Sequence, residues 1–194
     1  AIEYSKAYKN NEKLYDCYYF LGSLYLETNN FNEAIVNFIK CSNYYEINQV
    51  RSSKVAKINY ALGTLYLEKR NFKIAKLYFN KSYSIYNAIN SNNTLVLIEL
   101  QKGLTLKANN KVEEAILVFD NIASTSRDVE PSKIEALYQL SKIYYTQEDY
   151  EKALDFSKRA LKLVENNSVG ISKKKILNNL ILICEKQEDY KLSN

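Results

Sequence analysis

The sequence predicts an all-α protein, built as a right-handed α-solenoid of antiparallel helix pairs. Three observations support this prediction: a repeat of 38–41 residues, helical spacing of apolar residues within each repeat, and only one proline in 194 residues. A fixed period of this size is typical of solenoids, in which one supersecondary unit stacks on the next. The repeat is marked by a glycine, an alanine and a phenylalanine: Gly22, Ala34 and Phe38; Gly63, Ala75 and Phe79; Gly103, Ala115 and Phe119.

A polar turn in the middle of each repeat gives a second mark of the same register. It is rich in Asn, Asp and Gln, whose side chains can bond free backbone N–H groups at the start of the next helix. Each turn leads into an apolar or aromatic residue: Phe31, Phe72, Val112, Tyr150 and Tyr190. The chain therefore divides into five repeats, the fifth cut off inside its second half. Their ranges are 12–52, 53–93, 94–130, 131–170 and 171–194.

Each repeat contains two stretches with apolar residues at helical spacing, one on either side of the turn. In the first repeat, Leu21 and Tyr25 belong to the first helix, and Ala34 and Phe38 belong to the second. Later repeats keep this pattern, and the fourth opens at Pro131, which the first turn of a helix tolerates. The expected helices span 12–28, 31–47, 53–69, 72–89, 94–108, 111–124, 131–146, 149–166 and 171–187.

Small residues mark the place where the two helices of a repeat cross. Glycine lies on the first helix and alanine on the second, as in Gly22 with Ala34 and Gly63 with Ala75. We expect these residues to face each other, because small side chains let two helix axes approach closely. Leucine, tyrosine and phenylalanine would then fill the space around the crossing.

The spacing Leu-Gly-x-x-Tyr, followed by the alanine and the phenylalanine, resembles the tetratricopeptide repeat. The first two repeats match best. The fourth has Ser141 at the glycine place and Phe156 one position early, and the fifth has Ile181 and Cys184 at the glycine and tyrosine places. The family's unit is about 34 residues long. The longer repeats of this chain look like the peptide-receptor domains of cytoplasmic quorum-sensing regulators in Gram-positive bacteria.

The chain has the marks of a fragment of a longer protein. We expect residues 1–194 to form a single superhelical domain, and residues 1–11 fit the tail of a preceding repeat. No apolar run approaches the ~18 residues that a membrane span needs, and no signal peptide is visible. We therefore expect a cytoplasmic protein with no membrane contact.

The sequence offers no catalytic or metal-binding constellation. It has no histidine, and its glycines are dispersed instead of gathered in a phosphate-binding loop. Cys41 at a small buried position and Cys184 at a core aromatic position are expected to act as small hydrophobic residues, far from Cys17. We expect no enzyme activity, no cofactor and no metal.

The net charge of +5 is modest and spread along the chain. The only basic run, Ser172-Lys173-Lys174-Lys175, opens a first helix and is expected to be a solvated face. Proteins that bind nucleic acid gather such charge on one surface. We therefore expect no direct binding of nucleic acid.

The tetratricopeptide resemblance implies that first helices line a concave groove. The positions three before and one after the glycine point into that groove in the family. Carried over, they are Tyr19 with Ser23, Tyr60 with Thr64, Leu100 with Leu104, Tyr138 with Lys142, and Asn178 with Leu182. Tyrosine recurs at the first of these positions, and its rigid apolar face with a polar tip suits capture of a peptide side chain. With eighteen tyrosines in the chain, packing within a repeat is an alternative role for some of these rings.

These observations favour a non-catalytic domain that binds a peptide or protein segment, as the sensing part of a bacterial cytoplasmic transcriptional regulator. Two alternatives stay open: a constitutive scaffold for protein assembly, and the regulatory arm of an enzyme that lies outside this chain. Formation of a homodimer is open as well. A clamp for the C-terminal carboxylate of chaperone tails is disfavoured, because Lys142 is the only basic residue among the groove positions.

Overall fold

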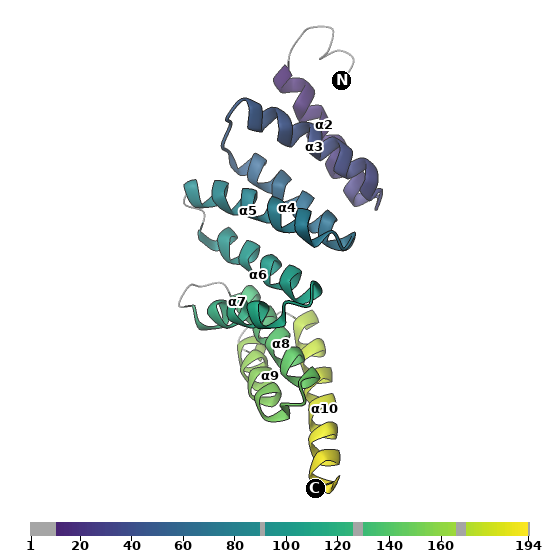
Figure 1. The fold of residues 1–194 in the computed structure, drawn as a ribbon, viewed down its shortest axis with the longest axis vertical. Helices are drawn as coiled ribbons and strands as arrows, with labels where there is room; N and C mark the ends of the chain where they lie inside the picture. The colour runs from purple at the N-terminus through teal and green to yellow at the C-terminus, as the bar shows by residue number, and fades with distance from the viewer. Residues whose placement is uncertain (1–10, 90–91, 126–129, 166–169, 194) are drawn as a thin grey trace. The chain divides into compact units, whose positions relative to one another are not determined.

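The computed structural model describes residues 11–89, 92–125, 130–165 and 170–193. Over these residues the chain forms nine α-helices and no strand, which confirms the predicted all-α fold (Figure 1). The helices are α2 Asn11–Glu27, α3 Phe31–Ile47, α4 Ser53–Glu68, α5 Phe72–Ala88, α6 Asn92–Ala108, α7 Val112–Ser124, α8 Glu130–Thr146, α9 Tyr150–Glu165 and α10 Gly170–Ser193. All but the last agree with the predicted ranges to within two residues.

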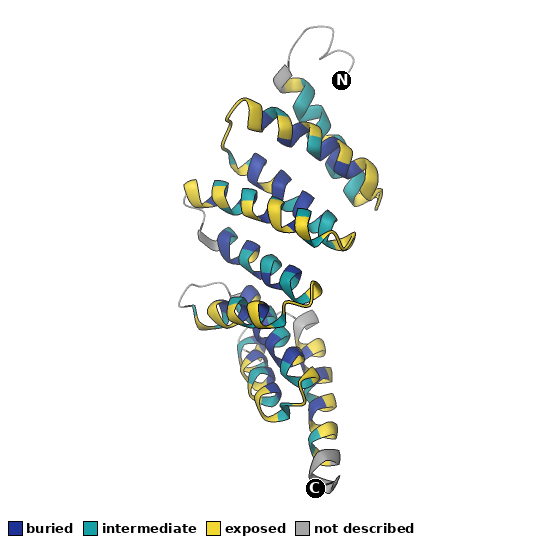
Figure 2. Cartoon of the chain, viewed as in Figure 1, coloured by how far each residue is buried: buried dark blue, intermediate teal, exposed yellow. Residues whose placement is uncertain are grey.

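The contacts within the chain define two compact units, an N-terminal unit of residues 1–101 and a C-terminal unit of residues 102–194. In the N-terminal unit, the pairs α2–α3 and α4–α5 enclose cores centred on Phe38 and Phe79. In the C-terminal unit, α8, α9 and α10 pack around Leu137, Ala160 and Ile176. Figure 2 shows the buried residues as stripes along these helices. None of the described helices is both long enough and apolar enough to cross a membrane.

Four of the repeats make the same turn after their first helix. One residue adopts a left-handed backbone, namely Asn29, Arg70, Asn110 or Glu148, with φ between 57° and 63°. The N–H of the following residue then bonds to a carbonyl five residues back, at 2.8–3.0 Å, which satisfies a free carbonyl at the helix end.

Side-chain capping of the second helix was predicted for every turn and is found in two of the described turns. Asn71 accepts a hydrogen bond from the Ile74 N–H, and Asp149 accepts one from the Lys152 N–H. Asn30 makes no such bond. The helix starts therefore do not depend on the cap alone, and packing of the second helix has to contribute.

The glycines make room for phenylalanine, and this corrects the predicted facing of glycine and alanine. A Cβ atom on Gly63 would lie 2.6 Å from Cε1 of Phe79, and one on Gly22 would lie 2.7 Å from Cδ1 of Phe38. Real Cβ atoms do not approach other atoms so closely. The alanines Ala34 and Ala75 are fully buried, but the ring of the second helix fills the space at the glycine.

The fourth repeat replaces this glycine–phenylalanine contact with a hydrogen-bonded cluster. The Oγ atoms of Ser141 and Ser157 lie 2.8 Å apart, and the Asn179 amide donates to both, at 2.8 and 2.9 Å. All three residues are buried. Ser157, and not Phe156, thus occupies the phenylalanine place. Phe156 instead stacks on Tyr144 with ring centroids 5.4 Å apart.

The end of α10 differs from the prediction. The turn expected at residues 187–190 is absent, and α10 continues to Ser193. The same four residues, Gln-Glu-Asp-Tyr, form the turn at 147–150, where Glu148 has a φ of 63°. There α9 packs back on α8. Glutamine and glutamate are good helix formers, so this segment is compatible with a continuing helix.

Candidate functional site

The predicted groove tyrosines of the N-terminal unit are held by the phenylalanines of the second helices. The ring centroids of Tyr19 and Phe38 lie 6.3 Å apart, and those of Tyr60 and Phe79 lie 5.8 Å apart in an edge-on arrangement. Both tyrosines are half-buried and pack against the core. Each precedes by three residues the glycine that accommodates the same phenylalanine. The two rings are therefore fixed platforms with one side on the core.

A charged pair lies beside Tyr19. Lys54, at the start of α4, forms an ion pair with Asp16 of α2, and its Nζ lies 5.1 Å from the centre of the Tyr19 ring. The Tyr45 hydroxyl of α3 donates to Oδ1 of Asp16 at 3.5 Å. Burial disfavours the charge on Lys54, but its bonds to Asp16 and Tyr45 outweigh burial and raise its pKa. One positive and one negative group thus lie next to an aromatic face.

Tyr60 has an uncharged polar neighbour. Burial raises the pKa of its hydroxyl, while a hydrogen bond with the side chain of Gln101 on α6 acts in the opposite direction. Leu100, the predicted groove residue of α6, is only 4% exposed and lies in the core. Gln101 therefore supplies the polar side chain at this place on α6.

The two predicted groove hydroxyls are bonded to their own helices. Ser23 Oγ donates to the carbonyl oxygen of Tyr19 at 3.1 Å, and Thr64 Oγ1 donates to that of Ala61 at 2.8 Å. Both side chains are half-buried. Because their protons are used within the helix, each offers a ligand only its lone pairs as acceptors.

The C-terminal unit places charged groups around Tyr138. This ring packs in the core of α8, α9 and α10, and the Nζ of exposed Lys142 lies 5.7 Å from its centre. Lys107 of α6 donates to Gln139 at 2.7 Å, and Gln139 donates to Glu135 at 2.7 Å. Burial lowers the pKa of Lys107, the charge of Lys142 lowers it further, and Glu135 raises it.

The remaining predicted positions are Leu104, which is half-buried, and Asn178 and Leu182, which are exposed on α10. The sequence prediction missed Asp16, Lys54, Gln101 and Lys107. Asp16 lies three residues before Tyr19 and Lys107 three residues after Leu104, so extending each helical face by one turn would have found them. Pairing of Lys54 with Asp16 is a contact between helices and has no signal in the spacing.

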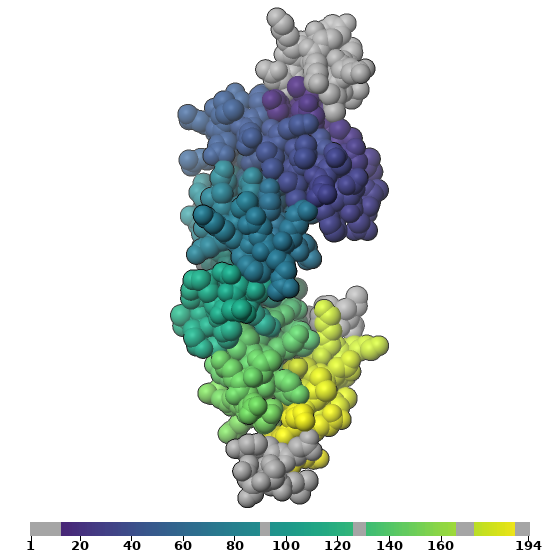
Figure 3. Space-filling model, turned by 45° about the vertical axis from the view of Figure 1, so that its right-hand side comes forward, coloured from purple at the N-terminus to yellow at the C-terminus, as the bar shows by residue number. Residues whose placement is uncertain are grey.

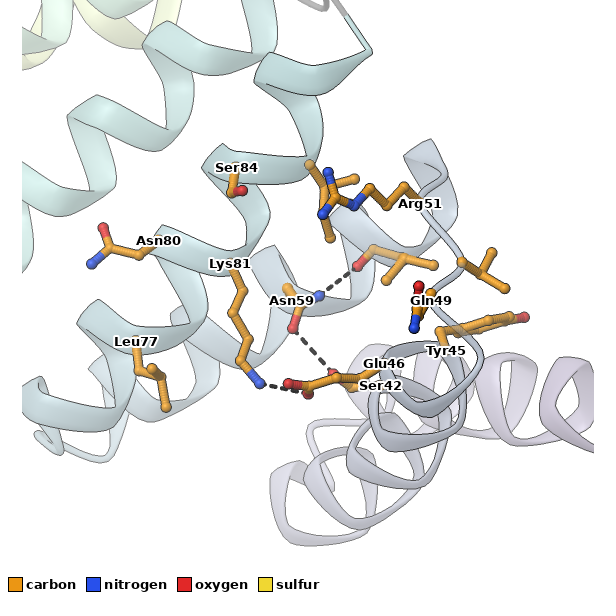
Figure 4. A pocket seen from close by; sticks show the side chains of 13 residues that line it. Ser42, Tyr45, Glu46, Gln49, Arg51, Asn59, Leu77, Asn80, Lys81 and Ser84 are labelled. Atoms are coloured by element: carbon orange, nitrogen blue, oxygen red, sulfur yellow. Dashed lines mark hydrogen bonds and ion pairs between the residues drawn. The ribbon is translucent and has the colours of Figure 1, made fainter.

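A pocket lies among the second helices of the N-terminal unit, away from the predicted groove positions. It is an open pocket of about 650 Å³ between α3, the start of α4 and α5 (Figure 4). Lys81 and Glu46 form an ion pair of 2.7 Å in its wall, and Ser42 donates to buried Asn59 at 3.1 Å in its floor. Arg51 extends over it from the connection before α4. The sequence did not predict this pocket.

Comparison with known proteins agrees with the repeat register. Residues 15–48, 56–89 and 134–167 match family models described as tetratricopeptide repeat, and together these segments cover just over half of the chain. No curated protein sequence matches the chain.

Several solved structures share the fold at low sequence identity. BtubC from P. vanneervenii superposes with a TM-score of 0.74 at 16% identity, over 98% of this chain and 82% of BtubC. The apo form of the quorum sensor NprR from B. thuringiensis gives 0.78 at 14% identity, over 93% of this chain and 53% of NprR. NprR in complex with its cognate peptide NprX gives a TM-score of 0.66 at 15% identity, over 90% of this chain and 51% of the NprR chain.

A further structure of the same fold is the Rap conjugation gene regulator of the plasmid pLS20, in complex with the Phr* peptide. It gives a TM-score of 0.66 at 18% identity, over 90% of this chain and 51% of the regulator. The chain thus spans about half the length of NprR and of this regulator. The matched repeats and the helix-pair fold lead to the same conclusion: the chain belongs to the tetratricopeptide repeat family.

Proposed function

We propose that this chain binds a peptide segment along its first helices, as the sensing domain of a bacterial cytoplasmic transcriptional regulator. The observation that carries the proposal is the repeated use of one helix position. Tyr19, Tyr60 and Tyr138 each present a ring that packs on the core and lies beside polar side chains. Such rings lose little conformational freedom on binding, and aromatic anchors of this kind dominate interface energetics.

The polar groups beside the rings suit the main chain of an extended segment. An extended peptide exposes N–H and C=O groups that need partners once they leave water. Asp16 can accept hydrogen bonds, Lys54 can donate them, and the Gln101 amide can do both. We therefore infer that the N-terminal unit satisfies a peptide backbone, while the rings of Tyr19 and Tyr60 contact its side chains and their hydroxyls each form a hydrogen bond with the peptide.

Proteins of the same fold support a peptide as the ligand. NprR has been solved with its peptide NprX, and the pLS20 Rap regulator with the Phr* peptide. Likeness to these proteins supports the proposed regulator role and cytoplasmic location. A helix-turn-helix segment in the full-length protein would support the regulator role, and its absence would favour a scaffold.

A peptide selection tests the proposal. A random heptapeptide library displayed on phage is selected against the immobilised chain, and the enriched peptide is titrated by calorimetry against Tyr19→Phe and Tyr60→Phe. These variants keep the ring packing and remove only the hydroxyl, so we expect each to weaken binding about fivefold, for a hydrogen bond worth about 1 kcal/mol. The matched control is Tyr78→Phe on α5, whose ring stacks on Tyr66 at 5.7 Å and lies on a second helix.

Two results would contradict the proposal. One is a selection that yields no peptide with saturable binding. The other is a selected peptide that binds both groove variants as tightly as the parent, which would place the peptide on another surface, such as the pocket beside Arg51.

A further inference from the structure

The open pocket between α3, the start of α4 and α5 is a candidate for a second binding site. The two second helices that flank it lie at the surface of the N-terminal unit, α3 in blue and α5 in blue-green in Figure 3. Four of the lining residues come from the end of α3 and the connection before α4: Glu46, Gln49, Val50 and Arg51. One side of the pocket is thus built from the stretch between the last marker of the first repeat and the first helix of the second.

The backbone on both sides of Arg51 is fixed by hydrogen bonds. Gln49 has a left-handed backbone with a φ of 54°, and the N–H of Val50 bonds to the carbonyl oxygen of Tyr45 at 2.9 Å. On the other side, the Ser52 hydroxyl caps the start of α4 by accepting a backbone hydrogen bond at 3.4 Å. The Arg51 side chain extends from this connection over the pocket (Figure 4). Because its backbone is held in place, Arg51 loses less freedom when it binds a ligand.

The charges of the pocket leave one cation for a ligand. The charged residues of the lining are Glu46, Arg51 and Lys81. Lys81 and Glu46 neutralise each other in an ion pair of 2.7 Å. Arg51 forms no ion pair within the residues that the structure describes. Two positive charges and one negative charge therefore give the pocket a net charge of +1.

The rest of the lining is apolar at the wall and internally bonded at the floor. Val50 and Leu77 are 40% and 52% exposed, and Ile85 is half-buried. At the floor, Ser42 donates to Asn59 at 3.1 Å, and the Asn59 amide donates to a backbone carbonyl of its own helix at 3.0 Å. Since these floor groups already have partners, the pocket offers a ligand mainly an apolar wall and the Arg51 cation.

We propose that this pocket binds a small organic acid, with its carboxylate on Arg51 and its apolar body against Val50 and Leu77. The planar guanidinium matches the two oxygens of a carboxylate and forms paired hydrogen bonds with them. A cavity of about 650 Å³ is within the range of sites for small molecules. Glu46 in the wall disfavours a doubly charged phosphate, so a singly charged carboxylate fits the net charge better.

An NMR titration of the isotope-labelled chain tests the site with a defined probe, hydrocinnamate, which carries one carboxylate and one phenyl ring. For a ligand of this size we expect saturable shifts of the backbone signals of α3, α5 and the connection before α4, with a dissociation constant of about 1–10 mM. The uncharged amide of the same acid should bind at least about fivefold more weakly. Absence of saturable shifts, equal binding of the amide, or shifts confined to the first helices would overturn the proposal.

Two substitutions test the charges with opposite signs. Arg51→Gln removes the cation but keeps a polar side chain, so the acid should bind at least about fivefold more weakly. Glu46→Gln removes the negative charge and frees Lys81, so the acid should bind about twofold to fivefold more tightly. The matched control is Arg70→Gln, at an exposed residue outside the lining, which should leave the affinity unchanged. Parent affinity in Arg51→Gln, or weaker binding in Glu46→Gln, would show that Arg51 does not hold the carboxylate.

A peptide probe distinguishes a free acid from an acidic side chain of a protein. The dipeptide of phenylalanine and aspartate, capped at both ends, carries the same ring and carboxylate but adds amide groups. It should bind more weakly than hydrocinnamate, because these amides lose water against an apolar wall. Tighter binding of the dipeptide would make the pocket a docking site for an acidic protein segment and would overturn the assignment to a small acid. The peptide proposed for the first helices depends on Tyr19 and Tyr60, so failure here leaves that proposal unaffected.

Discussion

At the scale of single residues, the packing of each helix pair depends on how side-chain volume is divided between the two helices where they cross. In the first three repeats a glycine leaves space for a fully buried phenylalanine ring, as with Gly63 under Phe79. In the fourth repeat both partners are serines, and the side chain of Asn179 completes the contact. The volume is redistributed, and every polar group in the new contact has a partner. A helix crossing tolerates the replacement of glycine and phenylalanine by two serines and an asparagine when the total side-chain volume is kept and the polar groups are hydrogen-bonded.

Asn179 should therefore contribute much more to stability than its neighbour Asn178. Asn179→Ala removes the amide that donates to both serines and leaves a small cavity, so we expect a loss of about 1–3 kcal/mol in the free energy of unfolding. Asn178→Ala, at an exposed position on the same helix, should change it by less than about 0.5 kcal/mol. Urea unfolding followed by circular dichroism measures both. Equal effects of the two substitutions would show that the serine–asparagine cluster adds nothing.

At the scale of the elements, a residue with a left-handed backbone marks the end of the first helix in four of the repeats. Asn29 and Asn110 suit this backbone, because asparagine tolerates it better than most residues. Arg70 and Glu148 adopt it with no such preference. The packing of the second helix against the first must offset the cost in those two turns.

The two copies of Gln-Glu-Asp-Tyr allow a test with opposite signs. Glu148→Gly relieves a left-handed residue and should raise the free energy of unfolding by about 1 kcal/mol. Glu188→Gly places glycine inside α10 and should lower it by about 0.5–1 kcal/mol. The measurement is chemical denaturation of each variant and the parent. Changes of the same sign would mean that the two copies do not differ in conformation in solution.

At the scale of the whole molecule, stability in a repeat protein is a sum over neighbouring elements. Each core involves helices that are adjacent in the chain, such as the Phe79 core shared by α4, α5 and α6. A defect in one repeat should therefore weaken its neighbours before it affects distant helices.

Gly63→Ala provides such a defect. Its Cβ would lie 2.6 Å from the Phe79 ring, so the ring or α5 must shift, and we expect a cost of about 1–3 kcal/mol. Hydrogen exchange read by mass spectrometry should show lost protection in α4, α5 and the helices next to them, with α9 unchanged. Loss of protection spread evenly over all helices would show instead that the chain unfolds as one cooperative unit.

The site was only partly open to prediction from the sequence. Repeat spacing predicts Tyr19, Tyr60 and Tyr138 as groove residues because a helical face recurs at fixed intervals from the glycine. It misjudged the environment of Leu100, which is buried, since a groove position and a core position differ by about one residue on a helix. Cys184 was expected in the core and is exposed on α10, because no described second helix covers that face.

The sequence by itself determined the all-α class, the period of the repeat and eight of the nine described helices to within two residues. These follow from local signals, namely apolar spacing, polar turns and the glycine marks, which act within one repeat. The tertiary structure alone decided the pairing of Lys54 with Asp16, the serine–asparagine cluster and the backbone conformation of each Gln-Glu-Asp-Tyr segment. That tetrapeptide turns at 147–150 and stays helical at 187–190. The turn at 147–150 is followed by packing of α9 on α8, a contact made by residues outside the tetrapeptide.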